Sequence, residues 1–227
     1  MIIYSGKSQL DNQTNIVCIA TDNSNNQKTG AMVQTWILHA DLDPISANRW
    51  GNDRGICGDC IHRGQEKSLF TFRGTAAGRS CYVLLLGPQS IYRTYVAGGY
   101  KTARPDKLSK LGRGRIIRVG SYGDPAAVPA HVWEELLSEA DTFTAYSHQS
   151  GWRPDIAMQS ADDYHSAVLH WKAGRRTFRV ISELGHLDRN NEALCPASKE
   201  AGRRVQCTAC KLCKGSNLGK SIAIVEH

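Results

Sequence analysis

Short hydrophobic runs alternate with polar stretches rich in glycine, asparagine and aspartate along this chain of 227 residues. Runs of roughly four to eight residues that contain β-branched and aromatic side chains are typical of buried strands. By this criterion we expect strands at residues 16–20, 32–39, 68–72, 81–86, 115–120, 142–146, 156–159 and 177–181. The polar stretches between them predict turns and loops.

Two segments of the second half carry the helical period instead. Residues 129–140 begin with proline, which is favoured at the first helical position, and place their apolar side chains on one face. A second helix is expected to be capped by Asp162, to run to Ala173 and to end at Gly174. Strands that alternate with helices predict right-handed βαβ units. The fold class is therefore α/β, with a largely parallel sheet or a compact, incomplete (β/α) barrel.

Composition bounds the domain organisation, because 41% hydrophobic residues suffice for one sizeable core in a chain of this length. We expect an α/β domain at residues 1–194, with a cysteine-containing loop insertion at 41–81. Residues 195–227 form a cysteine-rich tail that packs on it. The N-terminus lacks a secretory signal, and no segment reaches the roughly 18 apolar residues of a membrane span. These features predict a cytoplasmic protein with no membrane partner.

The tail carries the strongest metal-binding pattern. Cys207, Cys210 and Cys213 follow C-x2-C-x2-C spacing, and Cys195 lies upstream in CPAS. Four thiolates close a tetrahedral zinc site or hold a [4Fe–4S] cluster, so both cofactors stay open. His227 is an alternative to Cys195 as the fourth ligand of a zinc site.

A second cysteine group lies in the loop insertion. Cys57 and Cys60 form ICGDC, His62 follows directly, and Cys81 comes after a gap. Three thiolates with His62 as a fourth ligand predict a second metal site, either a closed zinc site or an open cluster that a substrate can reach.

Polar side chains recur where the predicted strands end. Asp124 follows the strand at 115–120, His148 follows the strand at 142–146, and Asp162 follows the one at 156–159. The carboxyl ends of parallel strands share one edge of the sheet, so these residues are expected to line one pocket. A carboxylate beside a histidine that titrates near neutrality predicts acid–base chemistry, and these three are the predicted catalytic residues.

Positive charge is concentrated in one stretch of a chain whose formal net charge is +7. Residues 101–118 contain seven cations and one acid. Such a stretch is typical of a surface that follows nucleic-acid phosphates. The predicted contacts are Lys101, Arg104, Lys107, Lys110, Arg113 and Arg115, and DNA is the expected partner rather than RNA.

Several short motifs occur in a fixed order: QTWIL, ICGDC followed by CYV, YGDPAAVP, YSHQ, RTFRV, and CPASKEAG leading into CTACKLC. Over residues 30–227 this set resembles a group of uncharacterised bacteriophage proteins. The resemblance implies a phage origin, and thus the cytoplasm of an infected host cell. The C-x2-C pair followed by a later CY is also similar to phage proteins thought to be related to radical SAM enzymes.

The chain also resembles the guanine transglycosylases, which exchange a base in tRNA or, in phages, in DNA. That resemblance implies a (β/α) barrel, catalysis by aspartate and a cysteine-rich zinc site near the C-terminus. It implies Asp124 as nucleophile or base and Asp162 as a second carboxylate.

The leading hypothesis is a phage metalloenzyme that modifies or processes a nucleic-acid base. The first alternative is a non-catalytic zinc-stapled protein that binds DNA or a host protein, with both cysteine groups structural. The second alternative is an iron–sulfur redox or radical enzyme that uses Cys57, Cys60 and Cys81.

Overall fold

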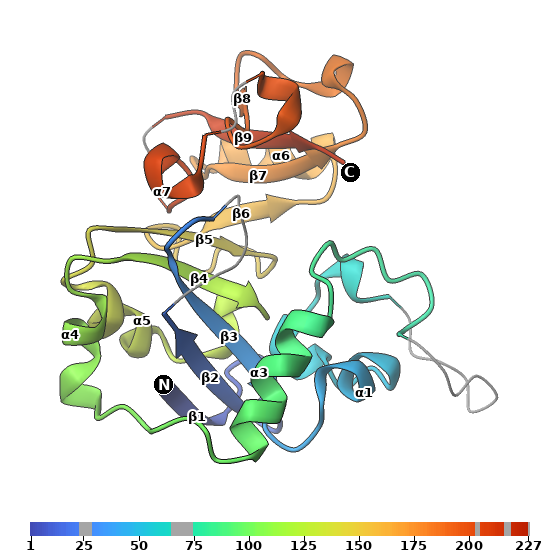
Figure 1. Ribbon diagram of the computed structural model, residues 1–227. Coiled ribbons are helices and arrows are strands. Elements are labelled where there is room, and N and C mark those ends of the chain that lie inside the picture. Colours follow the sequence, from blue (N-terminus) through green and yellow to red (C-terminus); the bar gives the residue numbers. More distant parts are fainter. Residues whose placement is uncertain (23–28, 65–74, 203–204, 216–218, 227) are drawn as a thin grey trace.

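The computed structural model describes residues 1–22, 29–64, 75–202, 205–215 and 219–226. In these ranges nine strands form one sheet, in the order β1-β2-β3-β4-β5-β6-β7-β9-β8. The strands are β1 (Ile2–Lys7), β2 (Asn15–Thr21), β3 (Val33–His39), β4 (Ile116–Tyr122), β5 (Thr142–Ser147), β6 (Met158–Ala161), β7 (Thr177–Ile181), β8 (Glu192–Leu194) and β9 (Ser221–Val225). Figure 1 shows the sheet extending from β1 near the bottom to β8 and β9 at the top.

Helices and short 3-10 turns connect the strands. The α-helices are α1 (Pro44–Arg49), α2 (Arg54–Cys57), α3 (Leu86–Val96), α4 (Leu108–Gly112), α5 (Ala130–Leu137), α6 (Tyr164–Lys172) and α7 (Cys207–Cys210). The 3-10 turns are η1 (Ile61–Arg63), η2 (Pro105–Lys107), η3 (Pro125–Ala127), η4 (Leu184–His186) and η5 (Lys199–Ala201). Helices α1 and α3 pack on β3, whereas α6 packs on β6 and β7. None of the helices in these described ranges is both long and apolar enough to cross a membrane.

The largely parallel sheet predicted from the sequence is confirmed. Only the two pairs β1·β2 and β2·β3 are antiparallel, and β3 through β8 all run in the same direction. The barrel alternative is wrong, because β1 and β8 are the two edges of an open sheet within the described residues. Strand β9 belongs to the predicted tail, yet it lies between β7 and β8. The tail therefore contributes to the sheet as well as packing on it.

Hydrophobic side chains of the strands and of α5 form the main core. Ile16, Ile117 and Trp133 are fully buried there. The Trp133 indole Nε1 donates a hydrogen bond to the carbonyl oxygen of Pro125, at 2.9 Å. This bond fastens the turn after β4 to the core, and that turn carries Asp124.

Two sequence-based assignments differ from the structure, and one falls outside it. Residues 81–86 are not a strand, because α3 begins at Leu86 and Leu86 is 76% exposed. Pro88 fits in the first turn of that helix, where a helix leaves its N–H groups unbonded. The cap of α6 is Asp163, whose carboxylate accepts a hydrogen bond from the Ser166 N–H, so Asp162 is not used as a cap. The predicted strand at 68–72 lies outside the described residues.

Candidate metal centre

The three residues expected at the carboxyl edge of the sheet do lie there. Strands β4 and β5 pair in parallel from Ile116 with Thr142 onward, and β5 pairs in parallel with β6. Asp124, His148 and Asp162 follow the ends of these neighbouring strands. The parallel topology thus places three chain segments beside one another, as the sequence pattern predicts.

Asp124 is buried and holds the loop that follows β5. Its Oδ1 accepts hydrogen bonds from the Ala126 N–H at 2.9 Å and the Ser147 hydroxyl at 2.8 Å. Its Oδ2 accepts one from the backbone N–H of His148 at 2.8 Å. Burial raises the pKa of this carboxyl, and the hydrogen bonds oppose that rise. The geometry gives Asp124 a positioning role toward His148, while the catalytic role stays a prediction.

His62 reaches the same edge from the loop insertion, which is built around a buried ion pair. The Arg63 Nη2 lies 2.7 Å from Oδ1 of Asp53, whose side chain is 4% exposed. The Asn48 side-chain amide donates to Asp53 Oδ2 at 2.6 Å and to the Arg63 carbonyl oxygen at 2.9 Å. Because burial of an unpaired charge is costly, this network fixes the backbone next to His62.

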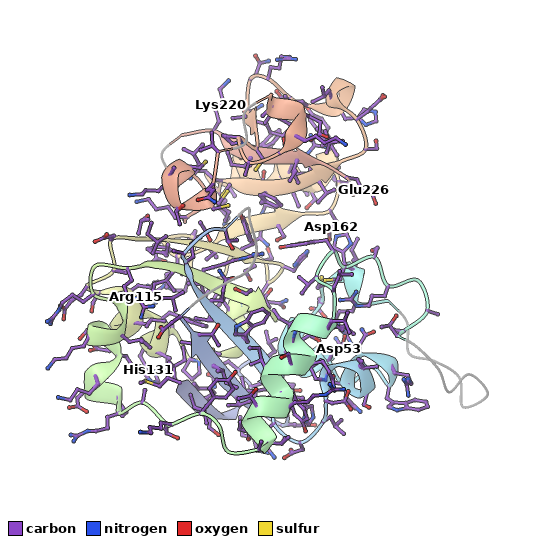
Figure 2. The ribbon with its side chains drawn as sticks, viewed as in Figure 1. Asp53, Arg115, His131, Asp162, Lys220 and Glu226 are labelled. Atoms are coloured by element: carbon purple, nitrogen blue, oxygen red, sulfur yellow. The ribbon has the colours of Figure 1, made fainter. Side chains whose placement is uncertain are left out.

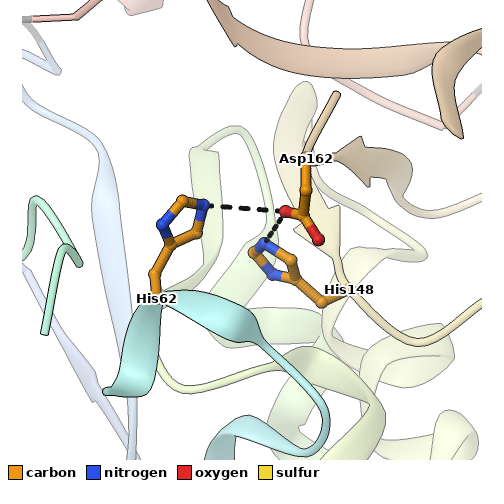
Figure 3. A group of neighbouring side chains, drawn as sticks. All are labelled: His62, His148 and Asp162. Carbon is orange, nitrogen blue, oxygen red and sulfur yellow. Dashed lines mark ion pairs between the residues drawn. The ribbon is translucent and has the colours of Figure 1, made fainter. Parts of the chain in front are cut away.

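The ligand atoms of three side chains converge at this edge (Figure 3). The Asp162 Oδ1 lies 3.6 Å from His62 Nε2 and 3.5 Å from His148 Nε2. Cys60 adds a thiol, whose Sγ lies 3.7 Å from the same His148 Nε2. In the described part of the chain, His62, His148 and Asp162 are the one group of possible ligands whose donor atoms all lie within 4.8 Å of one another.

These distances are typical of ligands around a metal rather than of direct hydrogen bonds. A good N–H···O hydrogen bond spans about 2.7–3.2 Å, which is shorter than both contacts to Asp162. A tetrahedron of nitrogen and oxygen ligands about 2.0–2.2 Å from zinc has edges of roughly 3.3–3.6 Å. The contacts of 3.5 and 3.6 Å match such edges, and an edge to sulfur is slightly longer.

A hydrogen bond through the other ring nitrogen orients the His62 ring. Its Nδ1 lies 2.8 Å from the Ser80 hydroxyl, and the N–H groups of Ser80 and Cys81 donate to the His62 carbonyl oxygen. With Nδ1 protonated and bonded to Ser80, the lone pair on Nε2 points at Asp162. Metal-binding histidines are commonly oriented through the other ring nitrogen in this way.

Charge in the metal-free cluster is held by the His148–Asp162 pair. Burial disfavours the imidazolium, but the interactions with Asp162 and Cys60 outweigh it and raise the pKa of His148 to about 10. His148 and then His62 lower the pKa of the Asp162 carboxyl. The side chains of His148 and Asp162 remain 23% and 31% exposed, so the cluster is open to water.

The other loop cysteines lie nearby but deeper. Cys57 and Cys81 both interact electrostatically with Cys60, although the three sulfur atoms do not all lie within 4.8 Å of one another. Burial raises the thiol pKa of Cys57 and of Cys81. The sequence grouped His62 with these three cysteines, whereas the structure places it against His148 and Asp162. The predicted thiolate site stays a prediction.

The tail cysteines lie against β5 and β9, because the Cys213 carbonyl oxygen accepts a hydrogen bond from the Ala145 N–H and the Cys195 N–H donates to the Ala223 carbonyl oxygen. Cys195 and Cys213 are buried and pack with Met158 and Ile222 in one hydrophobic cluster. Burial raises the pKa of the Cys213 thiol to about 12.

The remaining two tail cysteines lie on one turn of helix. Cys207 and Cys210 are the first and last residues of α7. Both interact electrostatically with Cys213, although no three of the four sulfur atoms lie within 4.8 Å of one another. The predicted zinc or [4Fe–4S] centre stays a prediction, and His227 lies outside the described residues.

The basic stretch lies at the amino ends of the parallel strands, opposite the carboxyl edge that carries the candidate metal centre. It leads into the amino end of β4, and Figure 2 shows Arg115 and Asp162 on opposite sides of the molecule. Arg113 pairs with Glu139, Arg115 with Asp22 at 2.7 Å, and Arg104 with Asp106 at 3.1 Å. Lys107 lies 4.0 Å from Asp106, so four of the six predicted nucleic-acid contacts are engaged with acids. Lys101 and Lys110 complete the set, which the structure separates from the candidate metal centre.

No protein-family model, curated protein or solved structure matches this chain. The resemblances to phage proteins and to guanine transglycosylases stay predictions. Since a fold does not define a function, the function is argued from the site.

Proposed function

We propose that this protein is a metal-dependent enzyme that acts on nucleic acid and modifies or processes a base. The observation that carries the proposal is the convergence of His62 Nε2, His148 Nε2 and Asp162 Oδ1 at the carboxyl edge of a parallel sheet. Three protein ligands with access to water are typical of catalytic zinc sites, whereas structural sites have four. The cluster therefore favours an enzyme over a zinc-stapled binding protein.

Zinc suits this set of donor atoms and supplies a bound water whose pKa falls to about 7. Neighbouring groups of the chain hold the ligand side chains in place. Asp124 fixes the backbone of His148, Ser80 orients His62, and Cys60 lies beside the ligand atoms. Two histidines and one carboxylate also bind non-haem iron, but octahedral ligands about 2.1 Å from iron would be only about 3.0 Å apart.

A groove of about 350 Å³ next to the cluster supports a phosphate-bearing substrate. It runs between α6 and the segment after β5, so that Ser150 and Asp163 of its lining are close neighbours in sequence of His148 and Asp162. The lining residues are Ser150, Asp163, His165, Ser166, Leu169, His170, Ala173 and Arg175. One guanidinium and two imidazoles offer N–H donors to phosphate oxygens, and the Asp163 carboxylate in the same lining accepts from the Ser166 N–H at the start of α6.

Metal binding is the first test. The metal-free protein would be titrated calorimetrically with Zn²⁺, Mn²⁺ and Fe²⁺, and compared with His62→Gln and Asp162→Asn. His131→Gln is the matched control, because His131 is exposed on α5, away from the cluster. We expect both cluster variants to lose one zinc equivalent that the control keeps. Equal zinc binding in all four proteins would refute the centre.

Activity is the second test. Zinc-loaded protein would be incubated with single- and double-stranded DNA and with RNA, and the products digested to nucleosides for mass spectrometry. An altered or released base that disappears with Asp162→Asn supports the proposal. A protein that binds zinc at the cluster and leaves all three substrates unchanged would instead support the non-catalytic alternative.

A further inference from the structure

Arg118 is a partly buried cation without a carboxylate partner among the described residues. It lies in the middle of β4, and its Nη2 donates to the Tyr82 hydroxyl at 3.0 Å. No described acid lies within 4.0 Å of its guanidinium. The groups around its charge are Tyr82, Tyr146 and Cys207. A cation that faces phenols and a thiol in this way lacks a compensating anion.

The tail cysteines lie on the same side of the sheet. Tyr146 packs against the cluster that contains Cys195 and Cys213, and its hydroxyl interacts with the Cys213 thiol. The Cys213 carbonyl oxygen accepts a hydrogen bond from the Ala145 N–H at 2.9 Å. The chain thus holds Cys213 from both its backbone and its side chain.

A second arginine holds the backbone on both sides of Cys213. The Arg176 Nη2 donates to the Leu212 carbonyl oxygen and its Nη1 to the Lys214 carbonyl oxygen, both at 3.1 Å. The Arg176 charge also interacts with Cys213. Two guanidinium groups, from β4 and from the start of β7, therefore face one group of cysteines.

We propose that Cys195, Cys207, Cys210 and Cys213 bind one anionic metal–thiolate centre whose charge is balanced by Arg118 and Arg176. This inference is independent of the proposed function. A Zn²⁺ ion on four thiolates carries a net charge of about −2, and so does an oxidised [4Fe–4S] cluster on four thiolates. Such a charge beside Met158 and Ile222 is costly unless cations are near, and Arg118 and Arg176 supply them, neither having a described carboxylate within 4.0 Å.

Arg118 acts here as a positioning residue, since it faces the centre without being a ligand. Groups outside the ligand shell typically change metal affinity by about 10- to 100-fold. The Tyr146 hydroxyl donates to the Cys213 sulfur in the loaded centre. Without metal the sulfur atoms interact only electrostatically. In the proposed centre the metal draws them into one coordination sphere.

The test uses the full chain with His62→Gln, which removes the edge centre, and compares it with the same chain carrying Cys210→Ser as well, so that metal in the tail is told apart from metal at the loop cysteines. The protein is purified without oxygen and analysed for zinc, iron and acid-labile sulfide. One zinc per chain, or iron with sulfide and a brown colour, supports the centre and distinguishes its two forms. A protein that takes up neither metal, or a Cys210→Ser variant with undiminished metal content, would overturn the proposal.

The charge-balancing role needs its own variants. Arg118→Gln should weaken zinc binding, measured by competition with a chelator, about 10- to 100-fold, and should shift the charge-transfer bands of the Co²⁺-substituted protein. In the iron–sulfur form the same variant should lower the reduction potential. Arg118→Lys should restore most of the affinity, and Arg93→Gln on the exposed face of α3 is the control. Unchanged affinity and unchanged spectra in Arg118→Gln would show that Arg118 balances no such charge.

Discussion

The two candidate metal centres of this protein differ in their donor atoms and in how the chain assembles them. The edge centre takes nitrogen and oxygen from His62, His148 and Asp162, which come from three separate segments and remain open to water. The tail centre takes sulfur from residues 195–213 alone, and two of its cysteines are buried. Ligands close together in sequence close a site around a local turn, whereas distant ligands require the finished sheet. The local cysteines of the tail centre suit a structural role, and the distant ligands of the edge centre suit a catalytic one.

The largest effect is expected from His148→Gln, which separates the two centres most sharply. His148 is the residue that contacts both Asp162 and Cys60, so its loss should abolish zinc binding at the edge and lower activity more than about 100-fold. Metal content of the tail should not change. Zinc stoichiometry and product formation, compared with His131→Gln, measure both.

The comparison also shows what the sequence reveals. The C-x2-C-x2-C spacing is a local signal, so the sequence predicts the tail cysteines as ligands without the fold. The sequence also predicts that Asp124, His148 and Asp162 lie at one edge, because the carboxyl ends of parallel strands must share it. Their neighbourhood was not recognised: His62 was grouped with Cys57 and Cys60, which are close in sequence.

The missed features depend on contacts between distant segments. Pairing of His62 with Asp162 arises because the loop insertion folds over the sheet, and no local pattern encodes it. The groove residue His170 lies on α6, whose sequence shows only a core face and a solvent face, and Arg175 lies in the short segment between α6 and β7. Strand β9 was missed because its apolar residues follow the cysteines, where a metal-bound tail was expected.

A large effect on stability is expected from Cys207→Ser. The free energy of metal binding to the tail is also folding free energy. Loss of one thiolate should therefore lower the free energy of unfolding by several kcal/mol, on the order of the loss expected when a structural zinc site loses a ligand. Strand β9 should loosen between β7 and β8, and the chain near the C-terminus should become sensitive to protease. Thermal unfolding and limited proteolysis are the measurements. Wild-type melting with full metal content would contradict the prediction.

A smaller effect is expected from Asp124→Asn, which distinguishes positioning from catalysis. Asparagine places an N–H₂ group where a carboxylate oxygen accepts from the His148 or Ser147 donor, so the variant should be less stable by about 1–3 kcal/mol. Zinc affinity should fall modestly because His148 is less well held. The turnover number of the zinc-loaded variant should be retained.

A catalytic Asp124 would give the opposite result. The variant would then bind zinc and nucleic acid normally and form no product. Chemical denaturation, zinc competition and turnover at saturating zinc separate these two outcomes.

The metal-free edge centre should also show a characteristic pH dependence. The folded-state pKa of His148 is raised from 6.5 to about 10, so its contribution to stability is complete below about pH 6.5 and is lost as the pH rises toward 10. The pKa of Asp162 is lowered, so its contribution is present above about pH 4 and is lost at lower pH. The melting-temperature difference between the wild type and Asp162→Asn should therefore be largest near pH 5–6 and vanish near pH 10. A difference that grows between pH 6.5 and 10 would contradict the pairing.

The smallest effect is expected from the basic stretch at the opposite edge, tested by Lys107→Ala, Lys110→Ala and Arg113→Ala together. Three contacts to duplex phosphates would flatten the slope of log affinity against log salt by about 2 to 3 units, at roughly 0.9 units per contact. The structure reduces that expectation, because Arg113 is paired with Glu139, and Lys107 has Asp106 at 4.0 Å. We expect a change below about 1 unit, whereas Arg175→Ala in the groove should alone remove about 0.9 units. Filter binding to one duplex at several salt concentrations measures both slopes. A loss of 2 units or more in the triple variant would show that the nucleic acid contacts this edge, as the charge pattern of the sequence predicts, and that it spans both edges of the sheet if Arg175 also contributes.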